Sequence, residues 1–251
     1  MIKESEDQNR TENSFFDVEV ALRCGFCVFG NSGSGKTNLA KLLAEKLRQR
    51  GIIVYVLDSS RQWFDFPFNH TIEVSRDRTR YEWVGSTLFD ISGLNINDKV
   101  KFANMLCQTL LDSHIKAYCP WEFVVFEEAQ LFLSNNALRN LSKYGSVLNL
   151  VSMGRNYNLR YGLISQFPSY VDKYLVRNTQ QRYFGYIFEP NDYRYARQIL
   201  GKEWVQKLKT LEVGEFLYQC KNRVQKIRVP LFGSLEEKNA YVSFQYSYQV
   251  V

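Results

Sequence analysis

The chain has 251 residues, of which 45% are hydrophobic and 23% are charged, as in an ordinary globular protein. This length fits one large α/β domain or two small ones. The sequence has no run of about 18 apolar residues that could span a membrane, and its polar first dozen residues do not resemble a secretory signal. Five cysteines at irregular spacing favour a reducing, intracellular setting.

The net charge of +6 is distributed unevenly along the chain. Residues 1–138 carry 15 Lys and Arg against 18 Asp and Glu, whereas residues 139–228 carry 16 against 6. This asymmetry favours a surface that binds a polyanion. A basic surface without any partner would give the same counts, so charge alone leaves both alternatives open.

The most informative motif is a complete phosphate-binding loop. It consists of Gly30, Asn31, Ser32, Gly33, Ser34, Gly35, Lys36 and Thr37. An apolar segment at 25–29 predicts a strand before the loop, and leucines at 39, 42, 43 and 47 predict a helix after it. The glycines allow close backbone approach, so we expect the eight loop residues to bind nucleotide phosphates. Lys36 is expected to neutralise the β- and γ-phosphates and Thr37 to bind Mg²⁺.

The rest of the chain alternates between strands and helices. We predict strands at 52–57, within 71–91, and at 123–126, 161–165 and 183–188, helices at 97–117, 135–158, 172–178 and 191–211, and a final strand pair at 215–220 and 223–229. Asn97 is expected to cap the helix 97–117. This alternation implies right-handed crossovers and a mainly parallel sheet. The predicted fold class is α/β, a three-layer P-loop NTPase fold of the RecA-like (ASCE) type with a C-terminal β-hairpin extension.

Polar residues stand at the carboxyl ends of several predicted strands, where such sheets bind ligands. Gly30, Asp58, Glu127 and Gln166 all occupy such ends. The pair Glu127 and Glu128 resembles a Walker B element, although its first acid is usually Asp. Glu127 is therefore predicted to bind Mg²⁺ with Thr37, and Glu128 to activate a water as the catalytic base. A surface acidic pair is the plain alternative.

Gln166 is the third predicted catalytic side chain. It ends the strand 161–165 and precedes Phe-Pro-Ser. A glutamine amide at this point can hydrogen-bond both the γ-phosphate and the attacking water. The alternative is an ordinary amide at a strand end.

Together these residues resemble the HerA–FtsK superfamily of hexameric, ATP-driven DNA translocases. The resembling segments, in chain order over roughly residues 20–230, are 30–37, 88–94, 124–129, 152–157, 162–169 and 213–217. The chain is most similar to the compact viral genome-packaging ATPases, and it is also similar to the motor domains of conjugation ATPases. The resemblance implies one P-loop ATPase motor domain, which we place at residues 15–232. The polar composition of the first residues predicts a flexible tail at 1–14, and residues 233–251 are assigned to a C-terminal tail.

The resemblance also implies partners and roles for basic residues. ATP and Mg²⁺ would lie between subunits of a homo-oligomeric ring, expected to be a hexamer, with double-stranded DNA in the pore. An arginine from the neighbouring subunit would stabilise the transition state, and among Arg155, Arg182 and Arg194 we favour Arg182. Arg139, Lys143, Arg155 and Arg160 are the expected contacts to DNA phosphates.

We therefore predict an ATP hydrolase that translocates DNA in genome packaging or DNA transfer. It is expected in the cytoplasm of the host cell, with transient association with a virion or a membrane and with a capsid or membrane protein as a further partner. One alternative is a conjugation or secretion ATPase that moves protein. Another is a scaffold that binds ATP but hydrolyses it poorly, an alternative supported only by the presence of Glu127 where Asp is usual.

Overall fold

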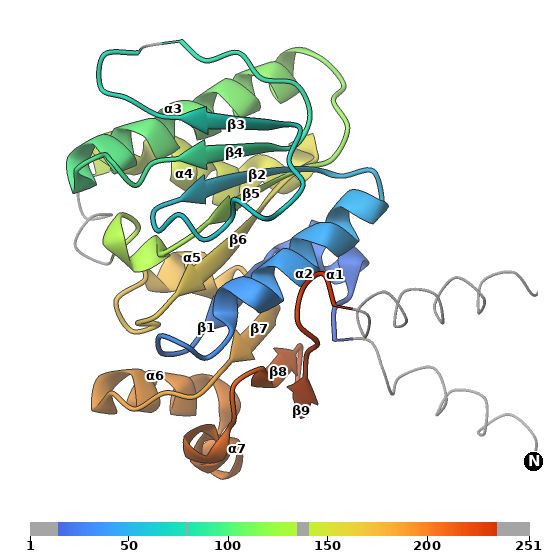
Figure 1. Cartoon of the computed structure of the whole chain (residues 1–251), viewed down its shortest axis with the longest axis vertical. Helices are drawn as coiled ribbons and strands as arrows, with labels where there is room; N and C mark the ends of the chain where they lie inside the picture. Colours follow the sequence, from blue (N-terminus) through green and yellow to red (C-terminus); the bar gives the residue numbers. More distant parts are fainter. Residues whose placement is uncertain (1–14, 79, 135–140, 235–251) are drawn as a thin grey trace, which may run out of the picture.

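The computed structural model describes residues 15–78, 80–134 and 141–234, which form a single sheet with helices on both faces (Figure 1). The strands are β1 (Phe26–Phe29), β2 (Ile53–Asp58), β3 (His70–Glu73), β4 (Thr87–Asp90), β5 (Glu122–Phe126), β6 (Leu159–Ser165), β7 (Gln181–Phe184), β8 (Glu215–Cys220) and β9 (Arg223–Arg228). The helices are α1 (Val18–Cys24), α2 (Lys36–Gln49), α3 (Ile96–Lys116), α4 (Leu141–Met153), α5 (Lys173–Arg177), α6 (Pro190–Leu200) and α7 (Lys202–Lys207), and short 3₁₀ turns are η1 (Ala129–Leu131), η2 (Gly154–Tyr157) and η3 (Leu208–Thr210).

The strand order of the sheet is β3-β4-β2-β5-β6-β1-β7-β8-β9. Every pair from β3 to β7 in this order is parallel, and β8 and β9 continue the sheet as an antiparallel hairpin. The predicted mainly parallel sheet with a C-terminal hairpin is therefore confirmed. Because parallel strands end at the same edge, the residues that follow β1, β2, β5 and β6 meet at the carboxyl edge.

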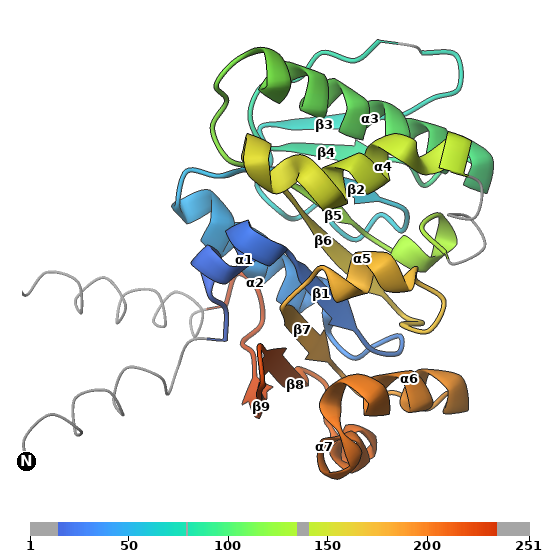
Figure 2. The same cartoon turned by 180° about the vertical axis from the view of Figure 1, so that it is seen from behind.

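Alternating side chains of the buried strands build two separate cores. On one face, Phe26 and Val28 pack with the leucines of α2, and on the other Cys27 and Phe29 pack in a second core that includes residues of α3, α4 and α5. Figure 2 shows α3, α4 and α5 in front of the sheet. Within the described ranges, none of the helices is long and apolar enough to cross a membrane.

Two helices, α1 and α3, differ from what we expected from the sequence. Helix α1 was not expected, and its side-chain cap comes from Asp17, which accepts a hydrogen bond from the Val20 N–H. Helix α3 begins at Ile96, and Asn95, not Asn97, caps it by accepting from the Asp98 N–H at 3.0 Å. The prediction of Asn97 as the cap is wrong because the spacing of apolar residues locates a helix better than it locates the first turn.

Strand β7 is shorter than predicted because the chain bends over the phosphate-binding loop. It ends at Phe184, and the following Tyr186 carbonyl accepts a hydrogen bond from the Asn31 N–H at 3.0 Å. A Cβ on Gly185 would lie 3.1 Å from the Ser34 Cβ, so a glycine suits this close approach. The residues after β7 therefore form one wall of the loop.

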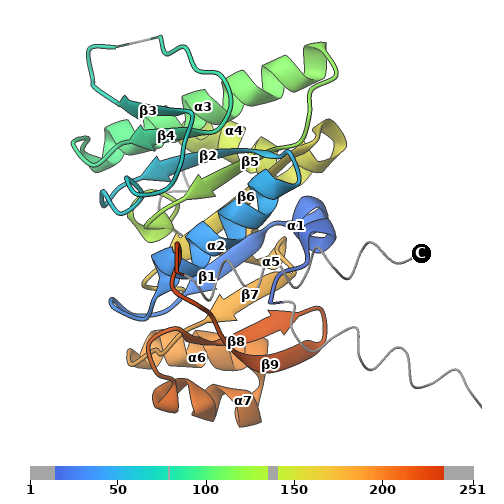
Figure 3. The same cartoon turned by 45° about the vertical axis from the view of Figure 1, so that its right-hand side comes forward.

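The segment after β9 returns to the same region from the opposite side. Figure 3 shows it rising from β9 and crossing in front of α2. The Asn38 side chain of α2 donates to the Pro230 carbonyl at 2.9 Å and accepts from the Phe232 N–H at 2.8 Å. This pair of bonds ties the end of the hairpin extension to the first turn of α2.

Candidate nucleotide hydrolysis site

The phosphate-binding loop has the backbone conformation that its glycines make possible. Gly33 and Gly35 have φ values of 77° and 93°, which side chains rarely allow. A Cβ on Gly30 would lie 2.7 Å from the Ser34 hydroxyl oxygen. Gly35 stands at the N-cap of α2 without a side-chain hydrogen bond. The first N–H groups of α2 therefore face the loop without a capping side chain, which is the arrangement that binds phosphate oxygens.

Lys36 lies over this loop. Its side-chain nitrogen donates to the Asn31 carbonyl at 3.0 Å, and the residue is buried. Burial lowers the pKa of Lys36, while the nearby Glu128 and Glu127 carboxylates raise it. A lysine held against a backbone carbonyl in this way can exchange that acceptor for phosphate oxygens, which carry more negative charge.

Thr37 and Glu127 form the pair that we expected to bind Mg²⁺. The Thr37 hydroxyl lies 3.2 Å from Glu127 Oε1, and Glu127 is only 1% exposed. Burial raises the pKa of the Glu127 carboxyl from 4.5 to about 7; the Trp63 hydrogen bond lowers it, Glu128 and Asp58 add smaller increases, and Thr37 lowers it. A hydroxyl beside a carboxylate is an oxygen-only ligand set of the kind that Mg²⁺ prefers, so these residues fit that ion.

A loop after β2 holds both members of this pair. The Trp63 indole N–H donates to Glu127 Oε2 at 2.8 Å, and the Gln62 amide oxygen accepts from the Thr37 hydroxyl at 2.7 Å. Asp58, at the end of β2, folds the loop. It accepts from the Ser60 N–H at 2.8 Å and from the Trp63 N–H at 3.1 Å. We did not predict Gln62 or Trp63. An Asp-Ser-Ser turn after a buried strand was the available signal for the loop, but it does not indicate which side chains reach the metal pair.

Glu128 is held at both carboxylate oxygens by amide groups. The Gln166 side chain donates to Oε1 at 2.5 Å, and the Gln130 side chain donates to Oε2 at 2.5 Å. Glu128 has a left-handed backbone with φ of 53°, which is uncommon outside glycine and is often found at functional sites. The structure thus brings Gln166 and Glu128, which follow neighbouring strands, into direct contact.

A cavity of about 320 Å³ lies between these groups. Its lining residues are Ser32, Gly33, Gly35, Lys36, Thr37, Asn38, Gln62, Glu128 and Gln166. The loop amides and the Lys36 ammonium are donors, whereas Glu128 is an acceptor. The cavity can therefore hold a polyphosphate with its terminal group near Glu128 and Gln166, and Glu127 lies behind Thr37.

The basic residues that were predicted to act on DNA or in a neighbouring site have different environments. Arg160 is buried and donates to the Leu22 carbonyl of α1 at 3.0 Å, so its prediction as an exposed phosphate contact is corrected. The strand alternation places it under α1, which the sequence did not reveal. Arg155 is exposed in η2. Arg139 lies outside the described residues, and Lys143 belongs to the part of α4 whose side chains are not described.

Arg182 is not at the carboxyl edge. Its register partner is Cys27, the second residue of β1, and it is half-buried. Its guanidinium donates to the Val176 carbonyl at 3.2 Å and to the Gln219 amide oxygen at 3.0 Å. To reach a nucleotide on another subunit, Arg182 would have to break these internal bonds. Arg194, in contrast, is exposed on α6.

Comparison with known proteins identifies the family. A model of the AAA domain matches residues 23–160, which is more than half of the chain and includes the phosphate-binding loop and both glutamates. The chain belongs to the AAA domain family. This AAA domain is thus a P-loop ATPase domain, and the predicted resemblance to the HerA–FtsK type is confirmed by the proteins that it matches.

One relative in sequence is the "Probable DNA double-strand break repair helicase HerA" of Methanocaldococcus jannaschii, which is 26% identical over 124 residues. The match spans 48% of this chain but only 24% of that protein. Two solved structures share the fold. The genome packaging NTPase B204 of Sulfolobus turreted icosahedral virus 2, in complex with ATP-gammaS, has a TM-score of 0.64 at 16% identity and covers 84% of this chain and 99% of its own. VirB4 of Thermoanaerobacter pseudethanolicus has a TM-score of 0.63 at 12% identity, with 85% and 90% covered.

Proposed function

We propose that this AAA domain is an ATP- and Mg²⁺-dependent motor that hydrolyses ATP to move DNA, most simply in genome packaging or DNA transfer, as part of a homo-oligomeric ring. The observation that carries the proposal is the contact of Glu128 with Gln166 in a cavity that also contains the phosphate-binding loop. Two adjacent buried acids at a strand end favour hydrolysis by water over transfer to a small molecule, which would need a substrate lid.

The positions of the side chains support a role for each of them in this reaction. The loop amides and Lys36 bind the phosphates and neutralise their charge. Thr37 and Glu127 would hold Mg²⁺, which when bound would supply positive charge to offset the negative charge of the phosphates. Glu128 accepts the proton of the attacking water. Each Glu128 oxygen accepts one amide hydrogen bond, from Gln166 or Gln130, and keeps a second lone pair that can accept the water proton. Gln166 can turn from Glu128 towards the γ-phosphate or the water.

DNA as the cargo is supported by charge and by the comparisons. Residues 139–228 have a net charge of +10, from 16 Lys and Arg against 6 Asp and Glu. The matched proteins include a helicase named for DNA repair and a genome packaging NTPase. Basic contacts of this kind give DNA affinity without sequence preference and make binding salt-dependent. In a ring, exposed Arg155 and Arg194 fit the role of the neighbour's arginine better than Arg182, which is bonded internally.

The test is the ATP hydrolysis rate of the full chain with and without duplex DNA, measured with the oligomeric mass in the presence of ATP. The proposal predicts a rate that duplex DNA stimulates and a ring-sized mass. Glu128→Gln should retain ATP binding but lose turnover. A monomer whose rate ignores DNA would contradict the motor function, and unchanged turnover in Glu128→Gln would contradict the assignment of the base.

The fold similarity to the cytoplasmic domain of the Thermomonospora curvata Type VII Secretion ATPase EccC makes a secretion ATPase that moves protein the second candidate. The same experiment separates the two functions, because a protein pump need not respond to duplex DNA. A ring that hydrolyses ATP at a rate independent of DNA would favour this second candidate.

A further inference from the structure

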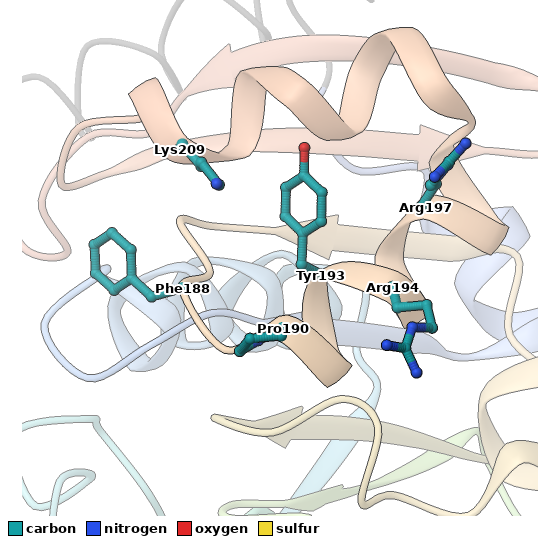
Figure 4. A pocket seen from close by; sticks show the side chains of 6 residues that line it. All are labelled: Phe188, Pro190, Tyr193, Arg194, Arg197 and Lys209. Atoms are coloured by element: carbon teal, nitrogen blue, oxygen red, sulfur yellow. The ribbon is translucent and has the colours of Figure 1, made fainter.

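A second cavity lies on the surface of α6, outside the hydrolysis site. Its volume is about 280 Å³, and it is lined by Phe188, Pro190, Tyr193, Arg194, Arg197 and Lys209 (Figure 4). We call it the α6 groove. Its lining combines two aromatic rings and three cations and includes no acidic residue. This composition differs from that of the hydrolysis site, where carboxylates face the phosphate-binding loop.

The cations of the α6 groove have no acidic partners among the described residues. None of the ion pairs found in that part of the chain involves Arg194, Arg197 or Lys209. Arg194 and Arg197 are three residues apart on an exposed helix face, a spacing at which like charges repel. The acid nearest in sequence on α6, Asp192, is buried and accepts from the Ser169 N–H at 2.8 Å. A bound anion would therefore relieve charge repulsion in this groove.

The aromatic side chains indicate that the anion is part of a larger ligand. Phe188 is 62% exposed, so its ring is open to a ligand in the groove. The Lys209 ammonium lies 5.2 Å from the centre of the Tyr193 ring. Figure 4 shows Phe188 and Lys209 on one side of Tyr193 and Arg194 and Arg197 on the other. Cations on both sides of aromatic rings suit successive phosphates of a chain whose bases stack on those rings.

We propose that the α6 groove binds a single-stranded segment of nucleic acid, with phosphates on Arg197 and Lys209 and an unpaired base against Phe188. Bases within a duplex are already stacked and cannot present a face to Phe188, so the exposed ring favours an unpaired strand. A free nucleotide is the weaker fit, because a strand offers several phosphates to the three cations together with a base for Phe188. The inference rests on the proposed function only in taking nucleic acid as the ligand.

The α6 groove also adjoins the hydrolysis site. The Phe188 ring is 5.3 Å from the Tyr186 ring, measured between centroids. The Tyr186 hydroxyl in turn donates to the Ser32 carbonyl of the phosphate-binding loop at 2.6 Å. A strand in the groove would therefore contact Phe188, which packs against Tyr186. Tyr186 in turn is hydrogen-bonded to the phosphate-binding loop.

The test measures the binding of a short fluorescein-labelled oligothymidylate to the full chain by fluorescence anisotropy. ATP is left out so that hydrolysis plays no part. Phe188→Ala should weaken binding about tenfold, as expected for the loss of one stacked base. Arg197→Ala and Lys209→Ala should each lower the slope of log affinity against log salt by about 0.7, the value for one phosphate contact on a single strand. Tyr118→Ala and Lys116→Ala, which remove an exposed aromatic and an exposed cation elsewhere, are the matched controls and should bind as wild type.

Wild-type affinity in Phe188→Ala and Arg197→Ala would overturn the groove as a strand site, and DNA-stimulated hydrolysis would then still support the proposed function. Strand binding that depends on the groove, without hydrolysis that DNA stimulates, would support the groove as a strand site and contradict the proposed function. A fluorescent ATP analogue is the second probe. If it binds to Lys36→Ala and this binding is lost when Arg197→Ala is added, the groove takes a mononucleotide, and the strand proposal is wrong.

Discussion

Replacing Glu127 with glutamine should make the protein more stable at neutral and alkaline pH while weakening its hydrolysis site. Burial raises the pKa of Glu127 from 4.5 to about 7, so folding opposes the charged carboxylate. The difference of about 2.5 pH units corresponds to about 3 kcal/mol, since each unit is worth about 1.4 kcal/mol. Glutamine keeps an oxygen that can accept from the Trp63 indole but carries no charge. The variant therefore avoids this cost.

The direction in which stability changes with pH follows from proton binding. Between pH 4.5 and 7 the folded wild type holds a proton that the unfolded chain has released, so wild-type stability falls as pH rises through this range. The advantage of Glu127→Gln should be full above pH 7 and nearly absent below pH 4.5. For a chain of this size, about 3 kcal/mol corresponds to a rise in melting temperature of roughly 6–12 °C.

The assay is thermal unfolding by circular dichroism at pH 8 and pH 5, for the wild type, Glu127→Gln and the surface control Glu82→Gln. Glu82 is exposed, so its variant should melt with the wild type at both pH values. A Glu127→Gln protein that melts at or below the wild-type temperature at pH 8, or a difference that does not shrink towards pH 5, would refute the reasoning.

The other predictions concern binding and catalysis. Trp63→Phe removes the hydrogen bond to Glu127 and should raise the Mg²⁺ concentration needed for nucleotide binding by about 10–100-fold in a fluorescence titration. The control Trp204→Phe should leave this concentration unchanged. An equal Mg²⁺ requirement in both variants would show that the Trp63 hydrogen bond is not needed. Gly30→Ala places a Cβ 2.7 Å from the Ser34 hydroxyl oxygen and should abolish nucleotide binding. At the control position Gly51 nothing lies within 4 Å of an added Cβ, so Gly51→Ala should still bind nucleotide. Nucleotide binding by both variants would contradict the loop geometry. Gln166→Ala should lower kcat by about 10²–10³ with a smaller effect on KM, and an unchanged kcat would remove Gln166 from the mechanism.

The sequence predicted the parts of the site that depend on local motifs and on parallel strand order. The phosphate-binding loop, the acidic pair after β5 and Gln166 after β6 were placed correctly because consecutive parallel strands end at one edge of the sheet. The roles of these residues stay predictions until they are measured. The positions of most strands and the C-terminal hairpin could also be predicted from the periodicity of apolar residues.

Other features depend on contacts between distant segments and could not be predicted. Trp63 meets Glu127 across 64 positions of the chain, and Arg160 meets Leu22 across 138. Charge counts treated Arg160 as part of a basic surface, although α1 covers it. The environment of Arg182 depends on Val176 and Gln219, one on each side of it in sequence, so its position in a strand did not show that its guanidinium was engaged.

The central claim is that ATP hydrolysis at this site moves DNA. The most direct measurement is displacement of a labelled third strand from a DNA triplex, with the full chain, ATP and Mg²⁺. The account predicts displacement that needs ATP hydrolysis and that disappears in Glu128→Gln, although this variant still binds ATP. Hydrolysis that DNA stimulates, with no displacement of the third strand from either end of the duplex, would contradict it.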